Sequence, residues 1–143
     1  MTELYEFAPP DGVEVIIEWL SALGIEVRDE RPAGAPLPFI MVHDLGGPDD
    51  GLVSKGVYSI HVFAETKPDA QALSMQVMRR LRLLARPFGG QQQVTISTGD
   101  VYVDNVSVVE RPREVELLDS GLPRSVYRYV GTYRVELRYA AVS

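Results

Sequence analysis

The amino-acid sequence predicts an α+β fold in two layers, a mostly antiparallel mixed sheet with two amphipathic helices packed on one face. The predicted segments follow in the order helix, three strands, helix, three strands. Each helix carries one apolar stripe, so each can cover a sheet from one side. Most links between strands are short enough for antiparallel pairing. The 143 residues are expected to form a single domain, 1–143, since domains most often have roughly 100–150 residues.

The first helix is predicted between Asp11 and Gly24. Asp11 follows two prolines and can cap the helix, and Glu14 three residues later completes a capping-box pattern. Gly24 is suited to end the helix. Trp19 lies beside the apolar stripe and is expected to pack rather than to bind a ligand. The stripe consists of Val13, Ile16, Ile17, Leu20 and Leu23.

Three strands are predicted next, over residues 25–30, 39–42 and 57–64. The first and third alternate apolar and polar side chains, whereas the second is a short continuous apolar run. Residues 31–38 form a loop by composition, and 44–56 are expected to form an exposed, mobile loop because of their glycines and paired acids.

The second helix is predicted to start at Thr66, which can cap it, with Pro68 in its first turn. It is expected to end before Pro87. Its apolar side chains are expected to pack on the sheet face that carries Tyr133, Val135 and Leu137. These side chains are Ala70, Leu73, Val77, Leu81 and Leu84.

Three further strands are predicted over residues 93–97, 101–109 and 127–139. The last has strict period-two alternation, typical of a strand with one buried and one solvated face. Residues 110–124 are predicted to be a long connection without regular structure, and such connections are often functional.

Charge is distributed unevenly along the chain. The net charge of −6 argues against a general nucleic-acid binder. Residues 1–30 hold eight acids and one base, whereas no acid lies between Asp69 and Asp100. Two interpretations remain open: solvated helix faces of opposite sign, or patches that meet between neighbouring copies. The candidate interface residues are Glu14, Glu18 and Glu26 on the acidic side and Arg79, Arg80, Arg82 and Arg86 on the basic side.

No catalytic, cofactor-binding or metal-ligating residue is predicted, and the chain is not expected to be an enzyme. It has no cysteine, and His43 and His61 lack the further ligands of a zinc site. Asp44, Asp49 and Asp50 lack the spacing of a calcium loop. No nucleophile elbow, Walker A loop or dinucleotide fingerprint occurs. No apolar run approaches the ~20 residues of a membrane span, and the acidic N-terminus is not expected to be a secretory signal.

Several segments together resemble a known viral family. They are the acidic helix 11–23, PFIMVHDLGG (38–47), the strand-to-helix passage YSIHVFAETKPDAQALSMQVMRRLRLL (58–84), and YRVELRY (133–139). Their order and character resemble the tail terminator (tail completion) proteins of long non-contractile-tailed bacteriophages, especially those infecting actinobacteria. The resemblance runs over nearly the whole chain.

The resemblance implies a structural virion protein without a cofactor. Such proteins form a six-fold ring on the last ring of the tail tube, stop its polymerisation and offer the docking surface for the head or neck. The implied partners are further copies of the chain, the tail tube protein and a head-completion or neck protein. DNA would pass through the lumen without specific binding, and the protein would lie at the tail–neck junction after assembly in the host cytoplasm. The candidate contact loop toward an adjacent ring or the lumen contains Asp44, Asp49, Asp50 and Lys55.

Two other functions remain open from the sequence. One is a head-closure or head–tail joining protein of the neck. The other, of a different class, is a small ligand-binding or regulatory domain encoded by a cell.

Overall fold

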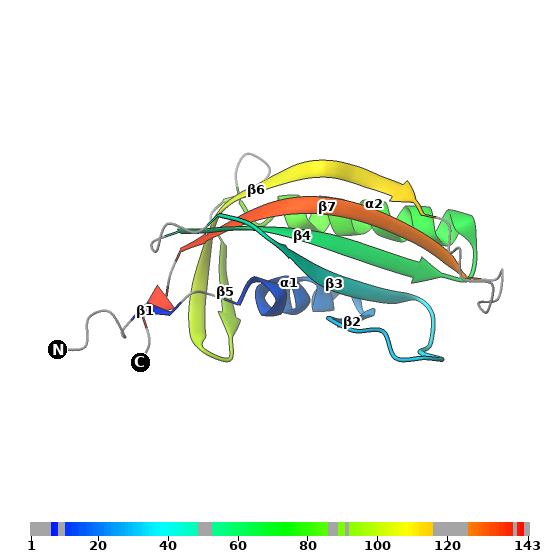
Figure 1. Cartoon of the computed structure of the whole chain (residues 1–143), viewed down its shortest axis with the longest axis horizontal. Coiled ribbons are helices and arrows are strands. Elements are labelled where there is room, and N and C mark those ends of the chain that lie inside the picture. Colours follow the sequence, from blue (N-terminus) through cyan, green and yellow to red (C-terminus); the bar gives the residue numbers. More distant parts are fainter. Residues whose placement is uncertain are drawn as a thin grey trace.

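A computed structural model describes residues 7–8, 11–48, 53–85, 89–90, 92–115, 126–138 and 140–141. Six strands form one sheet in the order β2-β3-β4-β7-β6-β5, with the helices on one of its faces (Figure 1). Among the described strands of this sheet, β2 and β3 pair in parallel, and the other neighbours pair antiparallel. The predicted α+β architecture with a mostly antiparallel mixed sheet is therefore confirmed.

Helix α1 (Gly12–Leu20) begins where the sequence predicts. The Asp11 carboxylate accepts the backbone N–H of Glu14 at 3.1 Å. A 3-10 turn, η2 (Ser21–Leu23), extends the helix to Gly24, which adopts the left-handed conformation at φ 75°. Val15 lies outside the predicted stripe and is nevertheless fully buried. The reason is that α1 contacts β3, β5 and α2, so that more of the helix surface is buried than one stripe.

The next three strands are β2 (Glu26–Arg28), β3 (Phe39–Gly46) and β4 (Val53–Ala64). The prediction of a loop over 44–56 is wrong at both ends. Asp44 pairs with Tyr58 within the β3–β4 ladder, and Lys55 lies on β4 opposite Glu136. The ladder continues because its backbone groups can pair whatever the side chains are, and the polar side chains here are exposed to solvent. Residues 49–52, with Asp49 and Asp50, lie outside the described residues.

Helix α2 (Lys67–Arg82) covers β4, β7 and β6. The Thr66 hydroxyl accepts the N–H of Asp69 at 3.2 Å, which confirms the predicted cap. All five predicted stripe residues are buried, and Ser74 and Met78 are buried beside them.

The remaining long strands are β5 (Gln92–Ile96), β6 (Gly99–Glu114) and β7 (Tyr127–Arg138). Tyr133, Val135 and Leu137 are buried under the helices, as predicted. The prediction of an unstructured connection from residue 110 is wrong, since β6 continues to Glu114. Register shifts let its pairing with β7 persist past Pro112. Residues 116–125 lie outside the described residues.

Strand β6 changes partners along its length. It pairs with β5 through residues 99–103, and from Val103 onward it pairs with β7. A register shift between Val103 and Asn105 marks the change, and the β5–β6 hairpin reaches α1 at one end of the molecule (Figure 1). Beyond Val103, no strand of the described part of the chain pairs with the outer edge of β6. That edge has two further register shifts, Pro112 and four charged side chains, Glu110, Arg111, Arg113 and Glu114.

Two short strands, β1 (Phe7–Ala8) and β8 (Ala140–Ala141), pair antiparallel in a small separate sheet. This pairing brings segments from the two ends of the sequence together.

We expect Leu81 of α2 and Leu83, the C-cap residue of this helix, to differ sharply in their contribution to stability. Leu81 is fully buried, whereas Leu83 is 43% exposed. Leu81→Ala should lower the free energy of unfolding by about 2–5 kcal/mol because it leaves a cavity under the helix. The matched variant Leu83→Ala should change it by less than about 0.5 kcal/mol. Denaturant unfolding of both variants measures this, and equal effects would contradict the docking of α2 on the sheet.

Candidate assembly surfaces

Trp19 and Arg80 hold the two helices together. The Trp19 indole Nε1 donates to the carbonyl of Arg80 at 2.7 Å, and Arg80 Nε donates to the carbonyl of Trp19 at 3.0 Å. The guanidinium also lies over the indole ring, 3.9 Å from its centroid. Trp19 is thus a packing residue, as predicted, and the Arg80 side chain is engaged within its own chain.

Other candidate interface charges also have partners within the chain. The Glu14 carboxylate accepts the N–H and the hydroxyl of Ser97, both at 2.9 Å, so the predicted capping box is only half formed. Glu26 pairs with Arg28 at 2.7 Å. The bonds between Glu14 and Ser97 hold α1 to the β5–β6 turn. The ion pair between Glu26 and Arg28 balances the two opposite charges on β2.

Arg82 is half-buried, and its charge opposes the rise in the pKa of Tyr133 that burial causes. Glu18 and Arg79 are exposed and make no ion pair within the described residues. Arg86 lies outside them. The role of these charges between subunits stays a prediction, and Arg79 is the arginine whose geometry favours it most.

A small polar hollow lies beside the candidate contact segment. Its volume is about 170 Å³, and Asp11, Asp44 and Tyr58 line it together with several glycines. Burial, with the negative charges of Asp44 and then Asp11, raises the pKa of Tyr58 to about 12. Lys55 faces away toward Glu136, 3.8 Å from its carboxylate. Of the four predicted contact residues, Asp44 therefore lines this hollow, Lys55 does not, and Asp49 and Asp50 lie outside the described residues.

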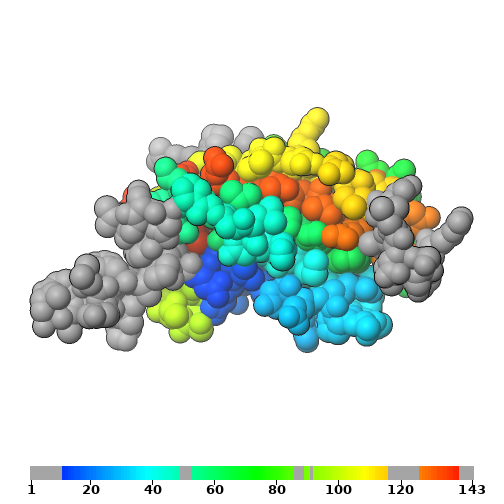
Figure 2. Space-filling model, viewed as in Figure 1, coloured from blue at the N-terminus to red at the C-terminus, as the bar shows by residue number. Residues whose placement is uncertain are grey.

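The sheet face opposite the helices is the open face of the molecule. Figure 2 views the molecule from this side, where β3 (cyan to teal), β4 (green), β7 (orange) and β6 (yellow) lie next to one another. Ser59, His61 and Phe63 are nevertheless buried there. The guanidinium groups of Arg31 and Arg128 lie 5.0 and 5.7 Å from the centroid of the Phe63 ring and cover it from above. Sequence reasoning missed this cluster, because Arg31 and Arg128 lie far from β4 in the sequence.

His61 is held as a neutral imidazole. Arg128 donates to its Nδ1 from Nε at 3.0 Å and from its terminal nitrogen at 2.6 Å. A guanidinium has only donors, so Nδ1 is the acceptor and the ring proton lies on Nε2. That proton is donated to Ser59 Oγ, 2.9 Å away. Burial, then the charges of Arg128 and His43, lower the pKa of His61 to about 4.

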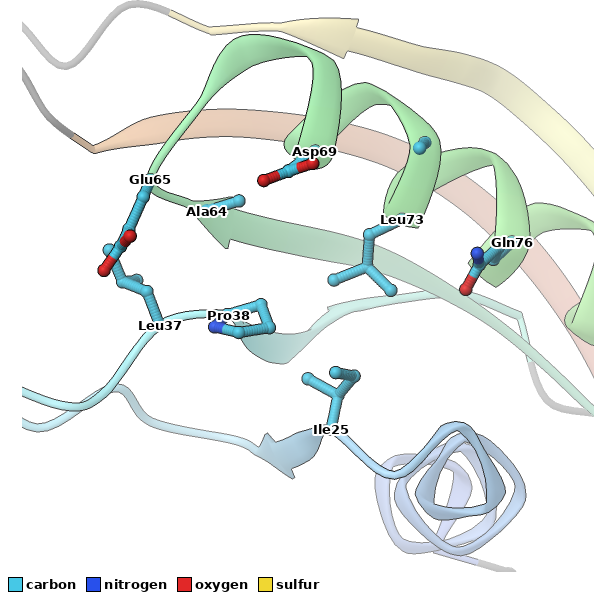
Figure 3. Close-up of a pocket in the computed structure, with 9 residues that line it drawn as sticks. Ile25, Leu37, Pro38, Ala64, Glu65, Asp69, Leu73 and Gln76 are labelled. Atoms are coloured by element: carbon cyan, nitrogen blue, oxygen red, sulfur yellow. The ribbon is translucent and has the colours of Figure 1, made fainter.

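A groove lies between α2 and the start of β3 (Figure 3). Its volume is about 280 Å³, and its middle is apolar, formed by Ile25, Pro38 and Leu73. The carboxylates of Glu65 and Asp69 lie toward one end, and the amide of Gln76 lies at the other (Figure 3). Three segments distant in the sequence form this groove, so no local pattern indicates it.

The described residues contain no group of three or more His, Cys, Asp or Glu side chains that could hold a metal ion. Among the same residues, no helix is both long and apolar enough to cross a membrane.

The fold is similar to that of a chain in a solved structure entitled "Virion of native gene transfer agent (GTA) particle". The TM-score is 0.51, the sequence identity is 16%, and the match covers 90% of this chain and 86% of that chain. At this identity, the likeness concerns the fold. No protein-family model matches the sequence, and no curated protein matches it.

The neutral state of His61 predicts a pH dependence of stability. The pKa of this imidazole is lower in the folded protein than its ordinary value of about 6.5. The unfolded chain therefore binds the proton more readily, and stability falls as the pH falls from about 6.5 to about 4. We expect a loss of about 1–3 kcal/mol over this window. His61→Gln, whose amide can replace both hydrogen bonds without titrating, should lack this loss in denaturant unfolding at each pH. Identical pH profiles for both proteins would contradict the assignment.

Gly12 and Gly56 leave space for the Tyr58 hydroxyl. A Cβ at either position would overlap that side chain, whereas a Cβ at Gly90 would meet nothing within 4 Å. We expect Gly12→Ala to lower the free energy of unfolding by about 1–3 kcal/mol, as overpacking does, and Gly90→Ala to leave it nearly unchanged. Thermal unfolding of the two variants measures this, and a Gly12→Ala protein as stable as the wild type would disprove the close approach.

Proposed function

We propose that this protein is a structural component of a phage-like virion and forms a ring that caps the tail tube. The observation that carries the proposal is the fold, which is similar over 90% of the chain to a chain of a gene transfer agent virion. The resemblance of the sequence to tail terminator proteins supports the same class of particle and the finer role.

In this role the ring ends polymerisation of the tube and offers a docking surface to the head or neck. Its partners are further copies of the chain, the tail tube protein and a head-completion protein. The proposal includes no catalytic step and no cofactor. DNA passes through the lumen without specific binding, and the net charge of −6 suits this passage because like charges repel.

A ring of identical subunits repeats one heterologous contact, so two different patches of each chain must be complementary. The two sides of this domain differ strongly in character. One is a helix layer with exposed apolar and arginine side chains on α2, and the other is an open sheet face with a buried histidine. Two chemically different surfaces are therefore available for such a contact.

Removal of the protein tests the proposed function. Particles produced without it should contain overlong tails that fail to join heads, because nothing ends the tube. Electron microscopy of such lysates measures tail length and attachment, with complementation by the wild-type chain as control. Tails of normal length without heads would instead identify a head–tail joining protein of the neck. Normal, infectious particles would refute a virion role and favour a cellular ligand-binding or regulatory domain.

A further inference from the structure

The groove between α2 and β3 has the dimensions and chemistry of a receptor for one long cationic side chain. Its volume of about 280 Å³ lies below the roughly 300–1,000 Å³ of most small-molecule sites. Glu65 and Asp69 are exposed and make no ion pair within the described residues. An arginine could place its aliphatic stem on Leu73 and Pro38 and its guanidinium on the two carboxylates.

The complementary shape occurs on the outer side of the same helix. Met75 and Arg79 of α2 and Leu83 at its C-cap follow one another at intervals of four residues. Because Leu83 keeps a helical backbone conformation, the three form one ridge. Met75 is 37% exposed and Leu83 43% exposed, although both are large and apolar. The buried residues of α2, among them Val77 and Leu81, lie on the opposite side. The ridge thus offers an arginine between two apolar side chains.

We propose that the ridge of one copy docks in the groove of the next, with Arg79 between Glu65 and Asp69 of its neighbour. Groove and ridge use different side chains of α2. The proposal is the head-to-tail form of this contact, in which each copy gives its ridge to one neighbour and its groove to another. The proposal rests on the proposed ring and identifies its subunit contact. It places the partner of Arg79 in the groove rather than at Glu14 or Glu26, which bind within their own chain.

The partner is a second copy because the chain itself carries the matching charge and apolar side chains. Among the arginines of α2, Arg80 is engaged by Trp19, and Arg82 is half-buried near Tyr133. Arg79 is exposed at the middle of the ridge. The apolar neighbours supply burial that an exposed ion pair alone would lack.

Disulfide trapping tests the contact directly, because the chain contains no cysteine. Within one chain, positions 65 and 79 are separated by at least twelve residues of helix, about 18 Å at 1.5 Å per residue. A disulfide spans only about 4.4–6.8 Å between Cα atoms, so a 65–79 bond can form only between copies. Glu65→Cys with Arg79→Cys should give a ladder of covalent oligomers in assembled rings. The matched control, Glu65→Cys with Arg111→Cys, should give at least tenfold less.

Charge exchange gives a second, independent readout. Arg79→Glu should reduce ring formation at least tenfold, and adding Glu65→Arg should restore most of it. Arg111→Glu, which changes an exposed arginine on β6, should assemble as the wild type does. All variants should unfold at the wild-type midpoint, which separates lost assembly from lost folding.

Three outcomes would overturn the inference. One is a ring that forms without a 65–79 crosslink and tolerates Arg79→Glu. Another is capture of a tail-tube or neck protein by a photocrosslinker attached to the thiol of the single variant Glu65→Cys, which would assign the groove to that partner. These first two outcomes are compatible with the proposed ring. Failure of the proposed ring function shows separately, as normal tails in particles that lack the protein. The third is a chain that forms no oligomer on tails or in solution.

Discussion

The alternation of β7 is the constraint on which the rest of the structure depends. This strand pairs along its whole length with β4 on one side and over most of it with β6 on the other, so its register fixes the centre of the sheet. Its odd-numbered residues lie under the helices, and its even-numbered residues lie on the open face. A shift of one residue would exchange these two sets. The same register places Arg128 beside His61 and Tyr133 under α2, so the polar cluster and the core depend on one strand.

Two adjacent arginines of α2 illustrate how helix geometry gives neighbouring charges different surroundings. Successive residues on a helix point about 100° apart, so neighbours in the sequence face different surroundings. Arg80 turns toward α1 and is held by Trp19, whereas Arg79 turns away from the sheet. The basic segment that forms one charge patch in the sequence is therefore divided in the structure: Arg80 stabilises the packing of the helices, and Arg79 is exposed to solvent.

The layers, both helix caps and most of the core could be predicted from periodicity and capping residues, because these signals are local. Strand ends were less predictable. Asp44, Lys55 and Arg113 are polar, yet backbone pairing carries β3, β4 and β6 through them. The groove and the His61 cluster could not be predicted, because each joins side chains from distant segments. Glu65 and Asp69 flank a helix start in the sequence, and the groove that they border is completed by Ile25, Leu37 and Pro38 from distant segments.

The outer edge of β6 bears on how the protein behaves at high concentration. Its irregular register, its proline and its charges interrupt the row of backbone donors and acceptors that another strand would need. Intermolecular strand addition, the first step toward fibres, is thereby disfavoured. What remains for association is contact between side chains, which requires a complementary surface on the partner rather than a free strand edge.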